Sequence, residues 1–372
     1  MKKKLGIYIH IPFCVRKCAY CDFLSAPAGE ETRQRYVERL LEEIRGAGKF
    51  SGTHRTATVF LGGGTPSLLT GAQMDSILET VDQVFGIPAE AEVTAESNPG
   101  TLTEEKLRDY RKAGINRLSM GLQSADNREL QTLGRIHTWE QFRENYELVR
   151  KTGFSNVNID LMSALPGQTR EGWLSTLKKV TALEPEHISA YSLIIEEGTP
   201  FYEKYRMDGP CEKELPGEEL DRIMYEDTKA YLHKKGYERY EISNYAKAGY
   251  ECRHNLSYWE RTDYKGFGIG AASLVDGVRY QNATVLESYL KGTFRYESVE
   301  PLNEQEILEE TMFLGLRKME GVRLTDRIRS AYGGVIRELT EEGLLEQRGE
   351  RICLTARGID VSNYALAKFL LD

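Results

Sequence analysis

Three cysteines near the amino terminus have the spacing of a metal-binding loop. Cys14, Cys18 and Cys21 follow a short apolar segment, whereas the remaining cysteines are isolated and far along the chain, at Cys211, Cys252 and Cys353. Cysteine sulfur is the usual protein ligand of iron–sulfur clusters, so three thiolates can hold three irons of a [4Fe–4S] cube. With no fourth cysteine nearby, one iron would stay open to an exogenous ligand, as the open position of a catalytic metal does. The spacing predicts a cluster with one open iron.

These cysteines have two other interpretations besides the cluster. They could be buried structural residues with one bystander, or they could bind zinc. Zinc sites use two closely spaced cysteine pairs, or added histidines at matching spacing. Neither pattern accompanies this loop, and we therefore favour the cluster.

A glycine-rich segment, Gly62-Gly63-Gly64-Thr65-Pro66, follows the second predicted strand. Consecutive glycines let the backbone approach a ligand closely and offer it N–H groups. The alternative is a tight turn between a strand and a helix, because such turns are often rich in glycine. We treat Gly63, Gly64 and Thr65 as candidate ligand contacts.

Four polar residues stand at or just beyond the ends of later predicted strands, namely Glu96, Gln123, Arg135 and Asp160. Taken singly, each is more typical of a surface charge or a loop residue. Together they could converge on one ligand, because a binding site needs a few well-placed polar groups.

The elements that must position these residues alternate between strand and helix over residues 1–200. Apolar runs predict strands at Leu5–Ile11, Thr56–Leu61, Glu92–Ala95, Arg117–Met120, Asn156–Leu161 and His187–Tyr191. Helical periodicity predicts helices at Arg33–Ile44, Gln73–Phe85, Glu104–Lys112, Trp139–Lys151 and Glu171–Ala182. This alternation indicates βαβ units and a parallel sheet. Six units are too few for an eightfold barrel, so we expect an open, partial (β/α)6 barrel.

The rest of the chain predicts two further regions. Residues 201–300 contain a helix at Glu218–Lys235 and then a Gly-, Tyr- and Asn-rich mixed β region. Residues 301–372 predict helices at Glu304–Arg317, Leu324–Ala331 and Val335–Glu342, and then a hairpin of Leu344–Gln347 and Arg351–Leu354. Helices followed by a hairpin are typical of a winged-helix-like α+β domain. Its low local basicity argues against DNA binding and favours a covering or docking role.

Composition agrees with a cytoplasmic globular protein. Of the 372 residues, 40% are hydrophobic and 28% are charged, and the net charge of −8 disfavours nucleic-acid partners. The first apolar run is too short for a signal peptide, and no run approaches the roughly 20 apolar residues that span a bilayer. Cysteine usage does not suggest a disulfide framework, and therefore favours a reducing compartment.

The C-x-x-x-C-x-x-C loop, preceded by Tyr-Ile-His-Ile-Pro-Phe, resembles that of the radical S-adenosylmethionine (SAM) superfamily. Within it, the loop is similar to the oxygen-independent coproporphyrinogen III oxidase group, which includes the HemW-type heme chaperones. The resemblance extends over most of the chain. It implies that SAM binds the open iron through its amino and carboxylate groups.

The resemblance also implies roles for individual side chains in binding SAM. The GGGTP segment would contact the methionine part, Tyr8 would face SAM, and Tyr20 would be an aromatic beside the third cysteine. Carboxylates such as Glu96 and Asp160 suit hydroxyls and an ammonium group, whereas Arg135 suits the SAM carboxylate through a charge-assisted pair.

Two features distinguish the branches of this group. True oxidases resemble C-x-x-x-C-x-x-C-x-C, but this chain has Phe23 at the fourth position, as the chaperone branch does. Residues 254–259, His-Asn-Leu-Ser-Tyr-Trp, are similar to the HNxxYW motif of the chaperones. That motif implies His254 as a heme ligand, a common role of histidine. The alternative is a core histidine beside an aromatic pair, and nearby Cys252 is more consistent with a small buried residue than with a ligand.

The resemblance therefore implies a heme chaperone that holds a SAM-linked [4Fe–4S] cluster and delivers heme to respiratory proteins, with a peripheral membrane contact. A coproporphyrinogen III dehydrogenase is the alternative, in which SAM cleavage yields a radical that decarboxylates the substrate. Another tetrapyrrole-modifying radical SAM enzyme is a third reading. An electron donor would be needed if SAM is cleaved.

Overall fold

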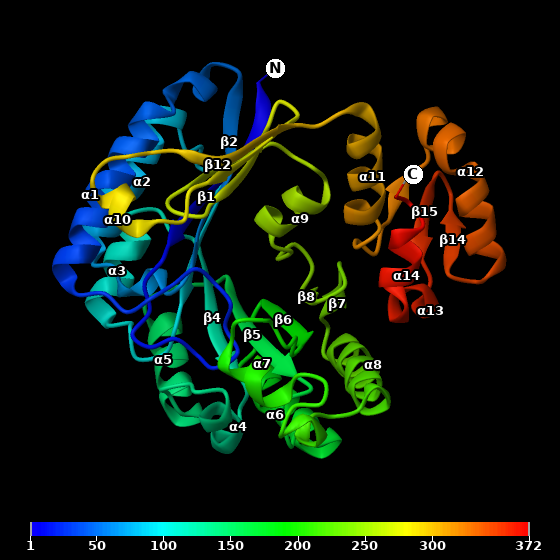
Figure 1. Cartoon of the computed structure of the whole chain (residues 1–372). Helices are drawn as coiled ribbons and strands as arrows, with labels where there is room; N and C mark the ends of the chain where they lie inside the picture. Colours follow the sequence, from blue (N-terminus) through cyan, green and yellow to red (C-terminus); the bar gives the residue numbers. More distant parts are fainter. Residues whose placement is uncertain (1, 371–372) are drawn as a thin grey trace.

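A computed structural model describes residues 2–370 of the chain. Its centre is a curved run of six parallel strands that are hydrogen-bonded in chain order (Figure 1). These strands are β1 (Lys3–Ile11), β2 (His54–Gly63), β3 (Glu92–Ser97), β4 (Arg117–Gln123), β5 (Val157–Ser163) and β6 (His187–Ser192). All six predicted strands are present, most of them longer by one to three residues. The six-unit open barrel is confirmed.

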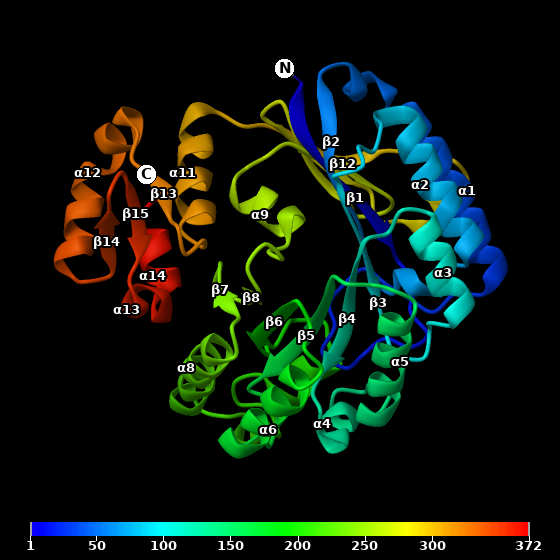
Figure 2. The same ribbon diagram turned by 180° about the vertical axis from the view of Figure 1, so that it is seen from behind.

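Helices that connect these strands cover the outer face of the sheet, as the two opposite views show (Figures 1 and 2). They are α1 (Glu30–Gly46), α2 (Gly71–Phe85), α3 (Glu104–Lys112), α4 (Asn127–Thr132), α5 (Trp139–Lys151) and α6 (Arg170–Thr181). Capping boxes mark the first residues of two of these helices: Thr70 pairs with Gln73 at the start of α2, and Thr138 pairs with Gln141 at the start of α5. Their apolar faces and the strands share one continuous core. The short α4 was missed because six residues carry too little periodicity.

Both edges of the core sheet are extended by strands from residues 238–301. At one edge, β9 (Tyr264–Phe267) pairs in parallel with β1, followed by β10 (Ala272–Val275), β11 (Val278–Asn282) and β12 (Tyr296–Pro301). At the other, β8 (Asn244–Ala246) pairs antiparallel with β6 and carries β7 (Glu238–Arg239). The mixed region therefore completes a 12-stranded sheet and shares its core, through residues such as Tyr245 and Phe267.

Four helices link these additions to the barrel. They are the long α8 (Glu218–Lys234) and the short α7 (Pro200–Tyr205), α9 (Arg253–Trp259) and α10 (Leu286–Leu290). Helix α9 packs against β2 on one side and α11 on the other. In both views it stands between the core sheet and the carboxyl-terminal domain (Figures 1 and 2). Among residues 2–370, no helix is long and apolar enough to span a bilayer.

The carboxyl-terminal domain has a separate hydrophobic core. It contains α11 (Glu304–Gly315), β13 (Val322–Arg323), α12 (Asp326–Glu341), β14 (Leu345–Arg348), β15 (Arg351–Leu354), α13 (Ala356–Asp360) and α14 (Ser362–Ala367), with a sheet in the order β13-β15-β14. The prediction of two helices around Gly333-Gly334 was wrong, because α12 is continuous. Two mid-helix glycines cost about 1 kcal/mol each, and burial of Ile328, Tyr332 and Leu339 offsets that cost.

Candidate functional site

A cavity of about 490 Å³ opens at the carboxyl ends of the parallel strands, where parallel α/β sheets place their ligands. Eleven of the thirteen residues predicted for the site line it: Cys14, Cys18, Tyr20, Cys21, Gly63, Gly64, Thr65, Glu96, Gln123, Arg135 and Asp160. The other two, Tyr8 and His254, lie elsewhere. The structure thus brings together residues that are up to 146 positions apart, from Cys14 to Asp160.

The cysteine loop is held in place by its backbone. The Cys14 N–H donates to the Ala26 carbonyl at 3.2 Å, and the Ala19 N–H donates to the Leu133 carbonyl at 3.1 Å. Within the described residues, the three sulfur atoms are not all within 4.8 Å of one another. Two thiolates on one tetrahedral zinc, each at about 2.3 Å, would lie only about 3.8 Å apart. The spacing therefore does not match a single zinc ion, and it leaves room for a larger cluster.

Arg135 joins the cysteine loop to the strand ends. Its Nη1 lies 3.7 Å from Cys18 Sγ, and its Nη2 donates at 2.6 Å to Asn98 Oδ1 and at 2.5 Å to the Gly121 carbonyl. The buried Nε has no hydrogen-bond partner within residues 2–370. The guanidinium therefore contacts both the cysteine loop and the end of β4. The Nε–H of this guanidinium is therefore a donor that an anionic ligand could use.

The glycine segment is shaped by close approaches. A Cβ at Gly64 would lie 2.6 Å from the Phe13 carbonyl oxygen, and one at Gly63, where φ is +109°, would lie 2.5 Å from the His10 ring. The Gly63 N–H donates to Glu96 Oε2 at 3.0 Å, and the Gly64 N–H donates to the Ile11 carbonyl at 2.9 Å. These two N–H groups are therefore used within the protein. Glycine is needed at Gly63 because of its positive φ and its contact with His10 of β1, and at Gly64 because of its contact with Phe13, the residue before Cys14.

Thr65 connects this segment to the cluster loop. Its Oγ1 lies 3.6 Å from Cys14 Sγ and accepts a 2.9 Å hydrogen bond from Asn98 Nδ2. Asn98 thus contacts both Thr65 and Arg135, through its two ends. Sequence reasoning missed Asn98, although the signal was available, because it follows Glu96 by two residues at the end of a strand.

Glu96 and Asp160 are two partly buried carboxyl groups that line the same cavity. Burial, reinforced by the charge of Asp160, raises the pKa of Glu96 to about 8, against the opposing effects of the Gly63 N–H and Arg117. Burial also raises the pKa of Asp160, whose oxygens accept from Asn158 Nδ2 at 2.8 Å and Ser119 Oγ at 3.1 Å. A cationic ligand would favour ionisation of such a pair. The ammonium and sulfonium of SAM meet that requirement.

Gln123 occupies a backbone conformation that is rare for its residue type, with φ at +74°. It follows an irregularity in the β4–β5 pairing, and its Oε1 accepts from the Tyr191 hydroxyl at 3.2 Å. Strained non-glycine residues often mark functional sites. Here the turn directs the chain from β4 into the loop that carries Arg135.

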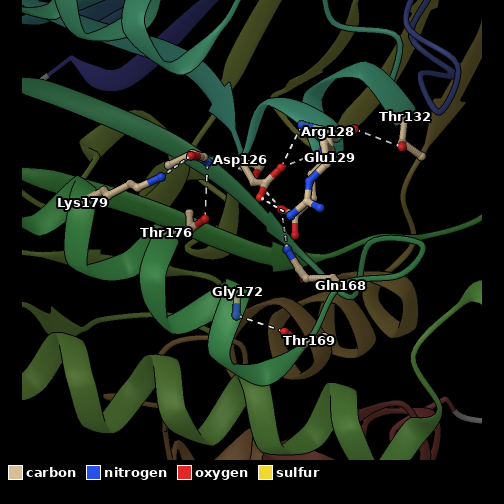
Figure 3. A network of polar contacts seen from close by, with 11 residues as sticks. Asp126, Arg128, Glu129, Thr132, Gln168, Thr169, Gly172, Thr176 and Lys179 are labelled. Atoms are coloured by element: carbon tan, nitrogen blue, oxygen red, sulfur yellow. Dashed lines mark hydrogen bonds and ion pairs between the residues drawn. The ribbon is translucent and has the colours of Figure 1, made fainter.

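That loop is anchored by a polar network (Figure 3). Asp126 caps α4 by accepting from the Arg128 and Glu129 N–H groups, and Gln168 donates to Glu129 at 3.0 Å. Lys179 on α6 donates to the Ala125 carbonyl at 2.7 Å. The network ties the segment after β4 to α6, and so fixes where the Arg135 loop begins.

The two predicted aromatic contacts differ in position. Tyr20 lines the cavity and lies against Arg135. The Tyr8 hydroxyl lies 3.0 Å from His10 Nδ1, and the opposite nitrogen of His10 lies 2.8 Å from the Leu24 carbonyl. His10, a residue that sequence reasoning missed, packs on Gly63, and the Tyr8 ring packs on Gly62. Tyr8 therefore lies behind the glycine segment and does not line the cavity.

His254 is buried in α9 with both ring nitrogens in contact with hydroxyls. Nδ1 lies 2.7 Å from Thr58 Oγ1, Nε2 lies 3.0 Å from the Tyr258 hydroxyl, and the ring stacks on Phe60 at 5.0 Å. Burial lowers its pKa to about 3. In this arrangement His254 has neither exposure nor a free nitrogen. Neighbouring Cys252 is fully buried, with its Sγ 3.6 Å from Glu92, as the sequence suggested.

Apolar side chains surround the mouth of the cavity. Val15, Phe23, Ile136 and Ile194 are all lining residues that remain more than half exposed. Phe23, in the position of the extra cysteine of the oxidases, is thus a solvent-facing rim residue.

The donor set fits the cluster and SAM on chemical grounds. Three thiols, a guanidinium with an unpartnered Nε and two partly buried carboxyls share one cavity. Such groups match an iron cluster and a zwitterionic sulfonium. This site on an open six-strand barrel defines a radical SAM protein, a class that implies a [4Fe–4S] cluster and SAM. Family models agree: that of the radical SAM superfamily matches residues 8–180, and that of the HemN C-terminal domain matches residues 302–361.

Relatives extend the match to nearly the whole chain. The chain is 36% identical to a heme chaperone HemW of Lactococcus lactis, over 100% of this chain and 99% of that protein. It is also 36% identical to one from Bacillus subtilis, over 98% of both chains. The chain belongs to the HemW family. Its fold matches that of Escherichia coli coproporphyrinogen III oxidase (HemN), with a TM-score of 0.83 and 22% identity over 99% of this chain and 90% of that one.

Proposed function

We propose that this protein is a heme chaperone, which binds heme and passes it to an acceptor protein while it holds a SAM-linked [4Fe–4S] cluster. The observation that carries this proposal is the match, over the full chain, to proteins named heme chaperones. Phe23 at the cavity rim supports it, because the oxidase pattern has cysteine there.

The chain's own residues would hold the cluster and SAM as follows. Cys14, Cys18 and Cys21 would ligate iron, and Arg135, which lies beside Cys18, would pair with the SAM carboxylate. Glu96 and Asp160 would receive cationic and hydroxyl groups. When bound, the cluster and SAM supply one-electron chemistry. The heme acceptors that we propose are respiratory proteins, and an electron donor is required only if SAM is cleaved.

A porphyrinogen-decarboxylating enzyme is the second candidate, because the fold matches the oxidase over nearly its whole length. One experiment separates the two. Reconstituted protein is incubated without oxygen with SAM, a reductant and coproporphyrinogen III, while hemin is titrated into a parallel sample. The chaperone predicts a shifted Soret band and no decarboxylated product. Turnover of coproporphyrinogen III would replace the chaperone with the oxidase.

A further inference from the structure

A second cavity, of about 430 Å³, lies between α1 and the strands added at the β1 edge of the sheet. Its walls come from the end of α1 and the turn after it, from β9, and from the segment that carries α10, which stands next to α1 in Figure 1. Among the described residues, it shares no lining residue with the cavity at the carboxyl ends of the strands. Small-molecule sites have volumes of about 300–1,000 Å³, so this cavity is large enough to hold a ligand.

Aromatic rings form much of the wall of this second cavity. Phe267 and Tyr289 are buried, whereas Phe294 and Tyr296 remain 40% and 43% exposed. The Phe294 ring packs edge-on against Tyr289, with the two centroids 5.3 Å apart. Exposed rings beside a cavity offer flat apolar surface that a planar ligand can cover. The wall therefore favours a ligand with a flat ring.

Lys265 places a buried cation against these rings. The residue is 3% exposed and lines the cavity, and its Nζ lies 5.1 Å from the Phe267 centroid and 5.3 Å from the Tyr296 centroid. Nζ donates to the Gly266 carbonyl at 2.9 Å and to Ser273 Oγ at 3.2 Å. Because an ammonium has three N–H donors, one of them has no acceptor within the described part of the chain.

The charge of Lys265 has no ion-pair partner among the residues that the structure describes. The two acids that line the cavity already have other partners: Glu42 pairs with Arg39 at 2.8 Å, and Glu43 accepts from the Tyr289 hydroxyl at 2.7 Å. Burial lowers the pKa of Lys265 to about 8, against the opposing effect of the Glu43 charge. Buried charges are normally paired, so an anionic partner would stabilise this ammonium.

Two further cations line the cavity at exposed positions. They are Lys49 and Arg295, and neither forms an ion pair within residues 2–370. Lys49 Nζ lies over the Phe50 ring, 5.0 Å from its centroid. The cavity therefore combines three cations that lack an ion pair with two acids that already have partners. This balance of charge favours an anionic ligand.

Aromatic walls and unpaired cations together match one class of ligand, an aromatic carboxylate. We propose that this cavity is a second ligand site, which binds a flat aromatic ring against Phe294 and Tyr296 and a carboxylate against the Lys265 ammonium. Small aromatic acids have this chemistry, and so do porphyrins whose rings carry carboxylate side chains. Neither the residues of the first cavity nor His254 takes part, so the inference does not depend on the proposed function.

The test titrates the full-length protein with 2-naphthoate, its uncharged analogue 2-naphthamide, and protoporphyrin IX, which lacks iron and cannot use a histidine ligand. Calorimetry measures the affinities of the naphthalene compounds, and absorption measures that of the porphyrin. Lys265→Met keeps the unbranched side chain but removes the charge and the donors. It should weaken the binding of 2-naphthoate about tenfold or more, the effect of one lost hydrogen bond to a charged group. The binding of 2-naphthamide should not change.

Two variants at exposed positions test the site even if Lys265→Met does not fold. Arg295→Met should weaken the binding of 2-naphthoate about twofold to fivefold, the size of an exposed ion pair. Phe294→Ala should weaken both naphthalene compounds about threefold, because it removes ring surface and no charge. Lys247→Met is the matched control, since Lys247 Nζ also lies over a ring, 5.6 Å from the Tyr237 centroid, but the residue lines neither cavity.

The two acids distinguish the sources of the ligand. Weaker binding of protoporphyrin IX by Lys265→Met would assign the site to a porphyrin, and an effect on 2-naphthoate alone would assign it to a small aromatic acid. The proposal would be overturned by unchanged binding of both acids in Lys265→Met and Arg295→Met, by an equal loss in Lys247→Met, or by a wild type that binds neither acid. The hemin titration tests the chaperone separately.

Discussion

Thr58 Oγ1 and His254 Nδ1 lie 2.7 Å apart, although 196 positions separate them in the sequence. The contact joins β2 of the barrel to α9, the helix that carries the HNxxYW-like motif. On its other side, His254 Nε2 contacts the Tyr258 hydroxyl. For His254 to bind heme iron, one of these contacts must be given up, and α9 must move enough to expose the ring.

Competition between Tyr258 and heme for His254 leads to the first prediction. Removing the hydroxyl in Tyr258→Phe should free Nε2 and strengthen hemin binding, whereas His254→Ala should weaken it and alter the Soret band. Both variants should retain the iron–sulfur cluster, since α9 lies outside the cysteine loop. Absorption titration with hemin measures both effects. Hemin spectra identical to that of the wild type in both variants would place the heme ligand elsewhere.

The second prediction concerns the cluster ligands. Anaerobic reconstitution should give about four irons per chain, and Ala in place of Cys14, Cys18 or Cys21 should abolish the charge-transfer absorption. Cys211→Ala and Cys353→Ala are the controls, because neither residue lines the cavity. Iron analysis and visible absorption are the measurements. Loss of the cluster in Cys211→Ala would contradict the three-ligand site.

Arg135 is the subject of the third prediction. Arg135→Ala removes a partly buried cation that contacts Cys18 and leaves Asn98 Oδ1 without its donor. SAM affinity should fall by about 1.5–3 kcal/mol, the size of a charge-assisted hydrogen bond. Arg143→Ala is the control, since Arg143 pairs with Glu147 at the surface of α5 and does not line the cavity. Equal SAM affinities in wild type and Arg135→Ala, by titration of the reconstituted proteins, would remove Arg135 from the site.

The raised pKa of Glu96 leads to a prediction about stability in the absence of ligands. The pKa lies at about 8 in the folded chain, above the ordinary 4.5, so the folded state binds the proton more tightly than the unfolded state does. The stabilising contribution is present below about pH 4.5 and is lost as the pH rises through about 8. Glu96→Gln cannot ionise, and its free energy of unfolding should fall less than that of the wild type over this window. Urea unfolding of both proteins at about pH 5 and about pH 9 tests this. If the free energy of unfolding changed equally in the wild type and in Glu96→Gln, Glu96 would not titrate between these two pH values.

The bounds of several helices, many of the cavity residues and the fold class depend on short segments of the chain, and the sequence was sufficient to predict them. Helices α3 and α5 begin and end at the predicted residues, because capping threonines and apolar periodicity are properties of short segments. Cavity residues from Cys14 to Asp160 could also be predicted, because parallel strands bring their carboxyl ends to one edge of a sheet. The fold class follows from the same alternation.

Only the tertiary structure decided how the later segments meet the barrel. Pairing of β8 with β6 places Asn244 beside Ser189, and packing of α9 on β2 turns His254 toward Thr58 and Asn255 toward the cavity. Antiparallel pairing and helix docking depend on contacts between segments far apart in the chain, and short strands carry little periodicity of their own. His254 and Asn255 are adjacent in the motif, but one is buried against β2 and the other lines the cavity. The docking of α9 on β2 decides this difference, and the sequence of the motif does not.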